Sequence, residues 1–381
     1  MTEKGPDTPS SDYEAMRSYW AMVTAIMGGT ATMRAAGETY LPRFEHESKK
    51  CYDTRLAAAK FTNIFGDIVD TLASKPFEQE IGVEKADAVK DLLEDIDGQG
   101  NHVHVWAANT FLSGVTDSIT WLFVDFTKGV PAGATVAEER ALGARPYWVQ
   151  IPATRLLAVY SETIAGKETF VHARIKEDAK QRDGYGEVVK ERVRVINREV
   201  AYNDSGDAVA AGPPIWELFE KQDAEGGKKQ WVSIGTGNYS IGYIPLFAFV
   251  TGKRLSGWVI RPALQSAAHL QIEHYQQESE LKYMRQRTAF AMLAGNGVSP
   301  DVGDDGNPKP IPVGPFGVLY APMSGDGQHG EWTTIEPQGT SLTFCSDEVD
   351  KTEKQLRELG RQPLTAQSGN ITRGGSANLN S

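Results

Sequence analysis

Few side chains in this sequence are arranged in a way that predicts chemistry. Asp301, Asp305 and Gly306 resemble part of a calcium-binding loop, in which oxygen ligands recur at alternate positions. The third position of such a loop would be Gly303 and the twelfth Pro312, and neither residue supplies a side-chain oxygen. The segment is therefore better interpreted as an acidic turn than as a metal site.

The histidines do not predict a metal site either. His102 and His104 would share one face of a strand, but they lie at the start of a predicted helix with no third ligand nearby. We expect both rings to be solvated or hydrogen-bonded. The spacing of His269 and His274 places them on different faces of a helix.

The common catalytic motifs are missing from the sequence. There is no G-x-x-x-x-G-K-[ST] loop for phosphate, and Gly235-x-Gly237 lacks the third glycine of a dinucleotide fingerprint. No grouping of Ser, His and Asp predicts a nucleophile. We therefore expect no catalytic residue, no metal and no cofactor.

Composition limits the possible partners. The chain has 381 residues, which predicts about two or three domains. It carries 39 basic and 50 acidic residues, a formal net charge of -11, which argues against a basic surface that coats nucleic acid. A polyanion could still pass along repulsive walls without being gripped. Cys51 and Cys345 are far apart in sequence and indicate reduced thiols. The sequence has neither an apolar signal core nor an apolar run of membrane-spanning length.

One long helical pattern organises the second half of the chain. It runs from Gly257 to Gly297, with Pro262 in its expected first turn. Its apolar stripe is thin, and most of the remaining positions are Gln and Glu. Such a helix suits packing against copies of itself with one face toward water, although a surface helix of one globular domain is the alternative. The stripe consists of Leu264, Ala268, Ile272, Tyr275, Leu281 and Met284.

The first third of the chain predicts helices. Ser11 and Glu14 form a capping box that opens a helix ending near Gly28. Ser48 is a candidate cap for a second helix, which Lys75-Pro76-Phe77 ends. Two further helices are expected at about 84–96 and through Val105, Ala108, Phe111 and Val115.

The middle third predicts an antiparallel meander, so the fold class is α+β. In the segment 189–195, valines alternate with Lys190, Arg192 and Arg194, which predicts one half-exposed strand. Glycine-rich turns separate the strands. The other strands are expected at 119–126, 147–151, 156–160, 169–175, 215–219, 230–234 and 244–250.

The pattern changes again after the long helix. Residues 299–315 are dense in Gly, Pro and Asp and predict a loop or irregular hairpin. Short strands are expected at 318–320 and 331–335, and a helix at 342–361. Residues 362–375 are small and polar with three glycines, which predicts a loop. No closing element follows, so we expect the chain to be truncated at Ser381.

The order of these elements resembles that of the portal proteins of tailed bacteriophages. Each local motif is weak alone, and the resemblance depends on their order along nearly the whole chain. The early motifs are Tyr40-Leu41-Pro42, Tyr52-Asp53-Thr54-Arg55 with 57–60, and Lys75-Pro76-Phe77; the later ones are 267–283, 291–297 and 368–376.

The resemblance implies a portal architecture. It divides the chain into a helical and β-meander wing (1–254), a first stem helix (255–289), an irregular clip (290–341), a second stem helix (342–361), a tunnel loop (362–375) and the start of a long wing helix (376–381). It also implies a ring, typically dodecameric, at one capsid vertex of the virion, assembled in the host cytoplasm. Double-stranded DNA would pass through its channel without sequence specificity and without any membrane.

The resemblance also implies partners and site residues. The partners would be the large terminase, the head-completion or adaptor protein, and the major capsid and scaffolding proteins. The candidate residues are Ser368, Gly369, Asn370, Thr372 and Arg373 in the tunnel loop, Glu273, Glu278 and Glu280 on the channel wall of the stem, and Asp301, Asp304 and Asp305 for partner contacts of the clip.

Two other classes of protein remain as alternatives. A tail or baseplate component could share the helices and the β meander, and a closed ring with an axial channel would separate it from a portal protein. An enzyme acting on nucleic acid would need a convergent acidic or histidine site, which the sequence does not show.

Overall fold

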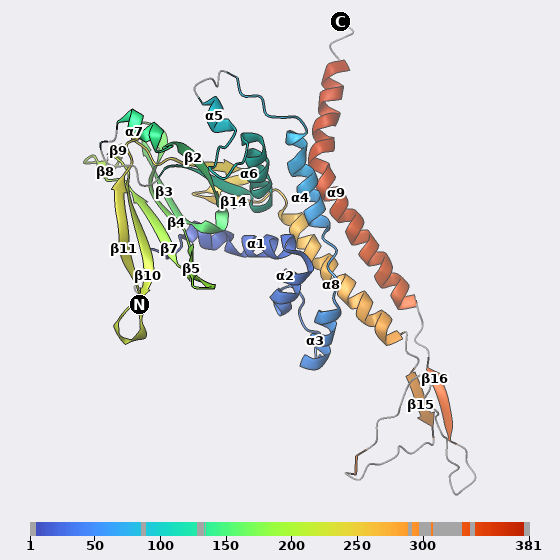
Figure 1. The fold of residues 1–381 in the computed structure, drawn as a ribbon. Helices are drawn as coiled ribbons and strands as arrows, with labels where there is room; N and C mark the ends of the chain where they lie inside the picture. The colour runs from blue at the N-terminus through green and yellow to red at the C-terminus, as the bar shows by residue number, and fades with distance from the viewer. Residues whose placement is uncertain are drawn as a thin grey trace. The chain divides into compact units, whose positions relative to one another are not determined.

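The computed structural model describes residues 5–84, 89–127, 133, 135–288, 292–296, 306–307, 330–335 and 340–376, and it is a mixed α+β structure (Figure 1). The helices are α1 (Ser11–Met27), α2 (Gly29–Ala36), α3 (Lys49–Ala58), α4 (Ile64–Ser74), α5 (Lys90–Leu93), α6 (Val103–Asp117), α7 (Val136–Ala141), α8 (Gln265–Thr288) and α9 (Thr340–Ser376).

Most strands lie between α6 and α8. They are β1 (Ile119–Phe126), β2 (Pro146–Pro152), β3 (Leu156–Ile164), β4 (Lys167–Lys176), β5 (Ala179–Asp183), β6 (Gly186–Lys190), β7 (Arg192–Asn197), β8 (Val200–Tyr202), β9 (Ala208–Ala211), β10 (Ile215–Asp223), β11 (Lys229–Asn238), β12 (Leu246–Val250), β13 (Lys253–Ser256), β14 (Val259–Arg261), β15 (Met292–Asn296) and β16 (Glu331–Ile335).

The chain forms two compact units that do not follow chain order. Unit 1 contains residues 1–33, 63–271 and 356–381, and unit 2 contains residues 34–62 and 272–355. Residues 34–62 thus pack with a segment from the second half of the chain, which the sequence does not predict. The domain boundaries implied by the resemblance stay a prediction.

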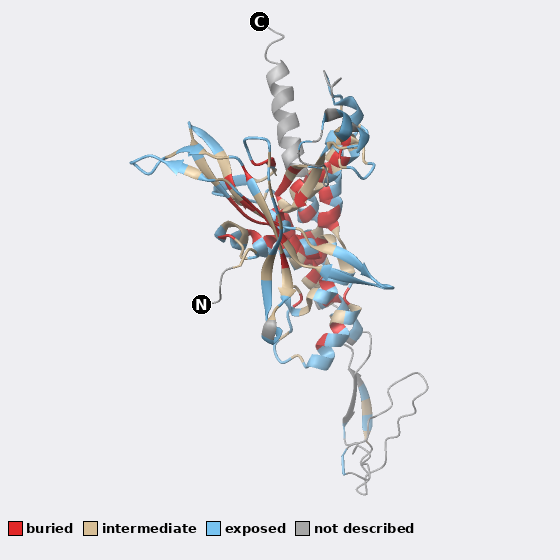
Figure 2. Cartoon of the chain, turned by 60° about the vertical axis from the view of Figure 1, so that its left-hand side comes forward, coloured by how far each residue is buried: buried red, intermediate tan, exposed pale blue. Residues whose placement is uncertain are grey.

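Unit 1 contains two main antiparallel sheets. One has the strand order β12-β1-β2 and the other β11-β10-β7-β4-β3. The predicted strand at 119–126 is confirmed with the same bounds as β1. Buried residues, red in Figure 2, gather on helices and sheet strands, whereas the ends of the hairpins are exposed.

The strand predicted at 189–195 is wrong in two respects. The structure ends β6 at Lys190 and starts β7 at Arg192, and the two strands belong to different sheets. Arg194, expected to face water, is only 5% exposed. The alternating charges predict the wrong exposure for Arg194, because its guanidinium pairs with carboxylates inside the protein.

These partners connect the two main sheets of unit 1. The Arg194 guanidinium lies 3.1 Å from Asp125 Oδ2 on β1 and 2.7 Å from Glu177 Oε1, just after β4. Burial alone would lower the pKa of Arg194, but the two carboxylates outweigh it and hold that pKa above its ordinary value. Arg194 therefore stays charged and ties β7 to β1.

Helix α1 begins one residue earlier than the predicted capping box. Its N-cap is Ser10, not Ser11, and Ser10 Oγ accepts a hydrogen bond from Tyr13 N. The Ser48 cap of α3 is confirmed, because Ser48 Oγ accepts from Cys51 N. The helix expected at 84–96 is reduced to the single turn α5 within the described residues.

The long helical pattern is also shorter than predicted. A β13–β14 hairpin occupies 253–261, with Gly257 at a φ of 50°, and α8 starts only at Gln265. Pro262 therefore precedes the helix. The β-branched Val259 and Ile260 favour the extended conformation there. The longest described helix is α9, not α8.

Helix α9 approaches α4 closely at a glycine. A Cβ added to Gly360 would lie 2.6 Å from Ile68 Cγ2 and 2.7 Å from Ile68 Cγ1. Both atoms belong to a β-branched side chain, which has little rotamer freedom in a helix. The close approach of α9 to α4 therefore requires glycine, which has no side chain, at position 360.

We expect Gly360→Ala to destabilise unit 1 by about 1–3 kcal/mol, because the added methyl overpacks the α4–α9 contact. Thermal unfolding of the full chain measures this. Gly82→Ala is the control, since a Cβ there meets nothing within 4 Å. In an Ile68→Ala background, which lacks both Cγ atoms, Gly360→Ala should cost less, and an unchanged cost would contradict the assigned contact.

Candidate functional site

The candidate site is built on the part of α8 that belongs to unit 2. In this unit α8 and the first part of α9 lie side by side, and Cys345 Sγ is 3.7 Å from Met284 Sδ (Figure 1). In chain order, β15 and β16 follow α8 and precede α9. They pair in antiparallel register from Met292↔Ile335 to Asn296↔Glu331. The strand predicted at 331–335 is thereby confirmed, and the one predicted at 318–320 lies outside the described residues.

A buried arginine organises the early segment of unit 2. Arg55 on α3 is 3% exposed. Its Nε and Nη2 donate to the two carboxylate oxygens of Glu47 at 3.0 and 2.7 Å, and Nη2 also donates to Pro42 O at 2.8 Å. The guanidinium lies over the Phe44 ring, 4.1 Å from its centroid.

The Arg55–Glu47 pair is shielded from water on both sides. The side chains are 2% and 3% exposed. The hydrogen bonds from Arg55 hold the pKa of the Glu47 carboxyl below its usual range, so the pair stays ionised at neutral pH. The donors to Glu47 are Arg55 and the backbone N of Phe44, which lie in the same segment. The pair therefore has a structural role.

The same segment holds α8 through polar contacts. Gln276 Nε2 donates to Tyr40 O at 3.0 Å, and Lys282 Nζ donates to Ala58 O at 2.6 Å. Such bonds replace water on backbone carbonyls that the helix would otherwise cover.

Glu278 belongs to this inner side of α8. Thr62 Oγ1 donates to Glu278 Oε1 at 3.0 Å, and Thr62 N donates to Glu278 Oε2 at 3.4 Å. Tyr275 is fully buried, with its ring centroid 5.5 Å from that of Phe61. His274 and Ser279 are also buried, so the buried side of α8 extends beyond its thin apolar stripe.

The outer face of α8 is acidic and exposed. Glu273 and Glu280 are both exposed and lie two turns apart, which places them on one face of the helix. Gln277, between them on this face, donates to Glu273 Oε1 at 3.3 Å. Of the three predicted wall residues, the structure thus leaves Glu273 and Glu280 facing water and ties Glu278 to Thr62.

The other predicted site residues lie in two segments. Asp301, Asp304 and Asp305 are outside the described residues. The loop expected at 362–375 is not observed, because α9 continues through this segment to Ser376. Once a helix has started, each further residue adds a hydrogen bond at little cost, so polar and small residues can extend it. The segment contains Ser368, Gly369, Asn370, Thr372 and Arg373, whose side chains are not described.

Sequence reasoning did not assign Arg55 and Glu47 a role. The available signal was the portal-like segment Tyr52-Asp53-Thr54-Arg55, whose first and last members are three residues apart on one helix face. Tyr52 and Arg55 point inward, whereas Asp53 and Thr54 are exposed. The buried positions of the motif are therefore the ones that hold unit 2 together.

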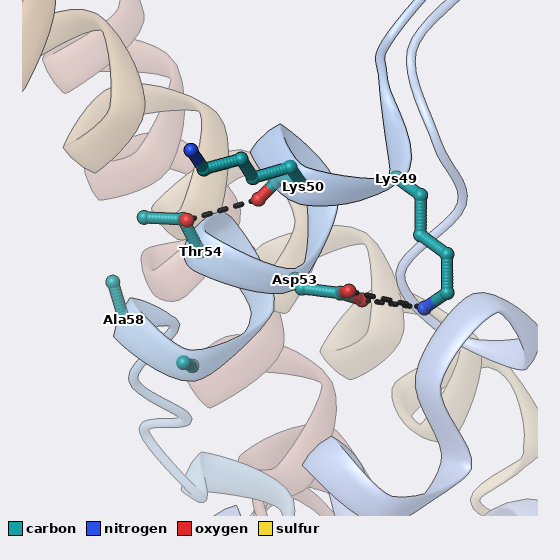
Figure 3. Close-up of a pocket in the computed structure, with 6 residues that line it drawn as sticks. Lys49, Lys50, Asp53, Thr54 and Ala58 are labelled. Atoms are coloured by element: carbon teal, nitrogen blue, oxygen red, sulfur yellow. Dashed lines mark hydrogen bonds and ion pairs between the residues drawn. The ribbon is translucent and has the colours of Figure 1, made fainter.

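The opposite face of α3 borders an open hollow of about 840 Å³ (Figure 3). Lys49 and Asp53 form an ion pair at 3.0 Å along its wall, and Thr54 Oγ1 donates to the Lys50 carbonyl. All described lining residues come from this one helix. A hollow with a single wall does not enclose a small molecule.

The paired histidines are hydrogen-bonded, as expected. His102 is the N-cap of α6, and its Nδ1 accepts from His104 N at 3.2 Å. His104 Nδ1 accepts from Ile81 N at 3.3 Å. In the described part of the chain, no group of three or more His, Cys, Asp or Glu side chains is placed to hold a metal ion.

None of the described helices combines the length and the apolar composition needed to cross a membrane.

Comparison with known protein families gives a match to about the last third of the chain. Residues 264–379 match a family model described as a domain of unknown function (DUF4055), which is found in phage-like proteins. The match covers the candidate site on α8, the excursion between the helices, and α9. No curated protein matched the chain.

We expect Arg55→Ala to destabilise unit 2 by about 3–5 kcal/mol, because it leaves the Glu47 carboxylate buried without its partner. Urea denaturation of the full chain, with hydrogen exchange of 40–62, measures the loss. Lys49→Ala on the same helix is the control, since its exposed pair is worth about 0.5 kcal/mol or less. Equal effects of both variants would show that Arg55 is not the anchor.

Proposed function

We propose that this chain is the subunit of a phage portal ring, the channel at one capsid vertex through which DNA is packaged and ejected. The observation that carries the proposal is the order of described elements within 264–379: the long helix α8, the two-stranded β15–β16 sheet, and the long helix α9. The match of this region to a domain of phage-like proteins supports the same proposal.

The two faces of α8 fit a helix that lines a channel. Its inner side is held by 40–62 through Thr62, Ala58 and Tyr40. Its outer side carries Glu273 and Glu280 toward water. Repeated around a ring, such acids would form a wall that repels the phosphate backbone, so DNA would slide without adhering.

The net charge supports passage of DNA over tight binding. A net charge of -11 per subunit argues against the broad basic surface by which most proteins hold DNA without sequence specificity. In a ring, neighbouring subunits would meet through heterologous contacts, which close when the rotation between copies is a simple fraction of a turn. Under this proposal the excursion 290–341 contacts the terminase motor and later the head-completion protein.

A tail or baseplate component is the second candidate. The match to a domain of phage-like proteins fits either class of virion protein. The two differ in assembly, because a portal forms a closed ring with an axial channel.

We expect the purified full-length protein to form large rings of about twelve subunits at micromolar concentration, since closed symmetry is usual for homo-oligomers. Mass photometry gives the stoichiometry, and electron-microscopy class averages down the particle axis show the channel. Monomers alone at this concentration would contradict the proposal. An open helical tube or a solid plug would favour the tail component.

We expect the double variant Glu273→Lys and Glu280→Lys to slow DNA passage several-fold, because lysines on the wall would attract phosphates. Packaged DNA per prohead and the rate of ejection measure the effect, which should weaken as salt rises. The control is Glu187→Lys with Glu199→Lys, an equal change of charge at exposed positions of the β-rich region. Unchanged packaging in the α8 variant would remove Glu273 and Glu280 from the wall.

A further inference from the structure

The β13–β14 hairpin presents two cations side by side. Lys253 and Arg261 are directly opposite each other in its register, which puts both side chains on one face with their Cβ atoms about 4.5–5.5 Å apart. Both residues are exposed, and neither side chain has a hydrogen-bonding or ionic partner among the described residues. Like charges in directly opposite positions are unfavourable. Lys253 and Arg261, here called the basic pair, are therefore suited to an anion that comes from outside the chain.

The hairpin holds the basic pair in a fixed place. Trp258 N donates to Asp12 Oδ2 at 2.8 Å, which fastens the hairpin to the first turn of α1. Arg254 Nη1 and Nη2 donate to the two carboxylate oxygens of Glu168 at 2.8 and 2.7 Å. Successive residues of a strand point to opposite faces, so Arg254 lies on the other face from Lys253. The cation that has an internal carboxylate is thus separated from the basic pair.

Helix α4 presents the opposite arrangement. Asp67 and Asp70 are both exposed and lie three residues apart, which places their Cβ atoms about 5–6 Å apart on the helix surface. Neither carboxylate has a hydrogen-bonding or ionic partner in the part of the chain that the structure describes. Helix α4 contains no basic residue that could pair with them. The spacing of these two carboxylates, here called the acidic pair, matches that of the basic pair to within about 1 Å.

The two pairs lie at opposite ends of α1 and do not meet within one chain (Figure 1). The hairpin is fastened to α1 at Asp12, whereas α4 begins beside the other end, where Asn63 Nδ2 donates to Ile26 O at 3.1 Å. Asp12 and Ile26 are fourteen residues apart on α1, which is about 21 Å along the helix axis. This is several times the length of a lysine or arginine side chain. A second copy placed head to tail can bring the two pairs together, which is the heterologous type of contact.

We propose that the basic pair of one copy binds the acidic pair of a second copy. The inference rests on the proposed ring and deepens it, because it names a contact between neighbouring subunits. The two surfaces are complementary in charge. Each copy has 50 acidic and 39 basic residues, so two copies repel each other on average. Cations without an internal carboxylate are where such copies can attract each other, and the basic pair offers two of them at the spacing of the two carboxylates on α4.

Charge reversal in the full-length protein tests the contact. Lys253→Glu with Arg261→Glu sets two carboxylates against the acidic pair of the neighbour. The concentration at which half of the protein is assembled, measured by mass photometry over a dilution series, should rise by about tenfold or more, because like charges across an interface are strongly unfavourable. Adding Asp67→Lys and Asp70→Lys reverses the acidic pair as well. This quadruple variant should therefore return to within about threefold of the wild type.

The matched control is Lys228→Glu with Lys229→Glu, an equal change of charge at exposed lysines beside the start of β11, and it should assemble as the wild type. If Lys253→Glu with Arg261→Glu assembles like this control, the basic pair makes no contact between copies. A quadruple variant that folds, judged by its circular dichroism spectrum, but does not recover would exclude the acidic pair as the partner. Either result overturns the inference.

A short DNA duplex tests a second source of anions. Binding of the duplex that is lost in Lys253→Glu with Arg261→Glu, while assembly is unchanged, would assign the basic pair to phosphates and overturn the inference. Wild-type protein that remains monomeric would contradict the proposed ring and this contact with it. Wild-type rings that are insensitive to all four substitutions would leave the proposed ring in place and remove this contact alone.

Discussion

The buried Arg55–Glu47 pair is the constraint on which unit 2 depends. Two charges at 2–3% exposure would each be costly to bury alone, so their mutual hydrogen bonds decide whether the segment 42–55 can fold at all. Through Pro42, Phe44 and Tyr52, the same guanidinium fixes the chain around α3. The support beneath α8 thus depends on one side chain that is itself buried.

Unit 1 uses the same device with different geometry. Arg194 joins two sheets through Asp125 and Glu177, and aromatic rings of Phe123 and Trp216 flank it. In both units a planar, always charged donor meets a carboxylate outside its own helix or strand, which gives direction as well as attraction; Arg55 has one such partner and Arg194 has two. Apolar packing brings these segments together, and the paired charges set how they are oriented.

The sequence predicts local structure better than it predicts burial. The α+β class, β1, α6, the Ser48 cap and the β15–β16 strands follow from hydrophobic period and turn residues, which act over a few neighbours. Arg194 and Glu278 carry charges that usually face water, but partners distant in sequence bury Arg194 and half-bury Glu278. The candidate face of α8 was found through Glu273 and Glu280. The Tyr52-Asp53-Thr54-Arg55 segment pointed to the neighbourhood of Arg55, but the pairing of Arg55 with Glu47 is seen only in the structure.

The division of unit 2 between 34–62 and 272–355 has a consequence for synthesis. The early segment leaves the ribosome about 210 residues before α8, and at about 5–20 residues per second this is a delay of some ten seconds or more. During that interval Tyr52, Phe61 and Arg55 lack the helix that covers them. The nascent chain therefore leaves these side chains uncovered during the delay. In that interval a chaperone would bind them, or neighbouring nascent chains translated from the same messenger RNA could associate wrongly.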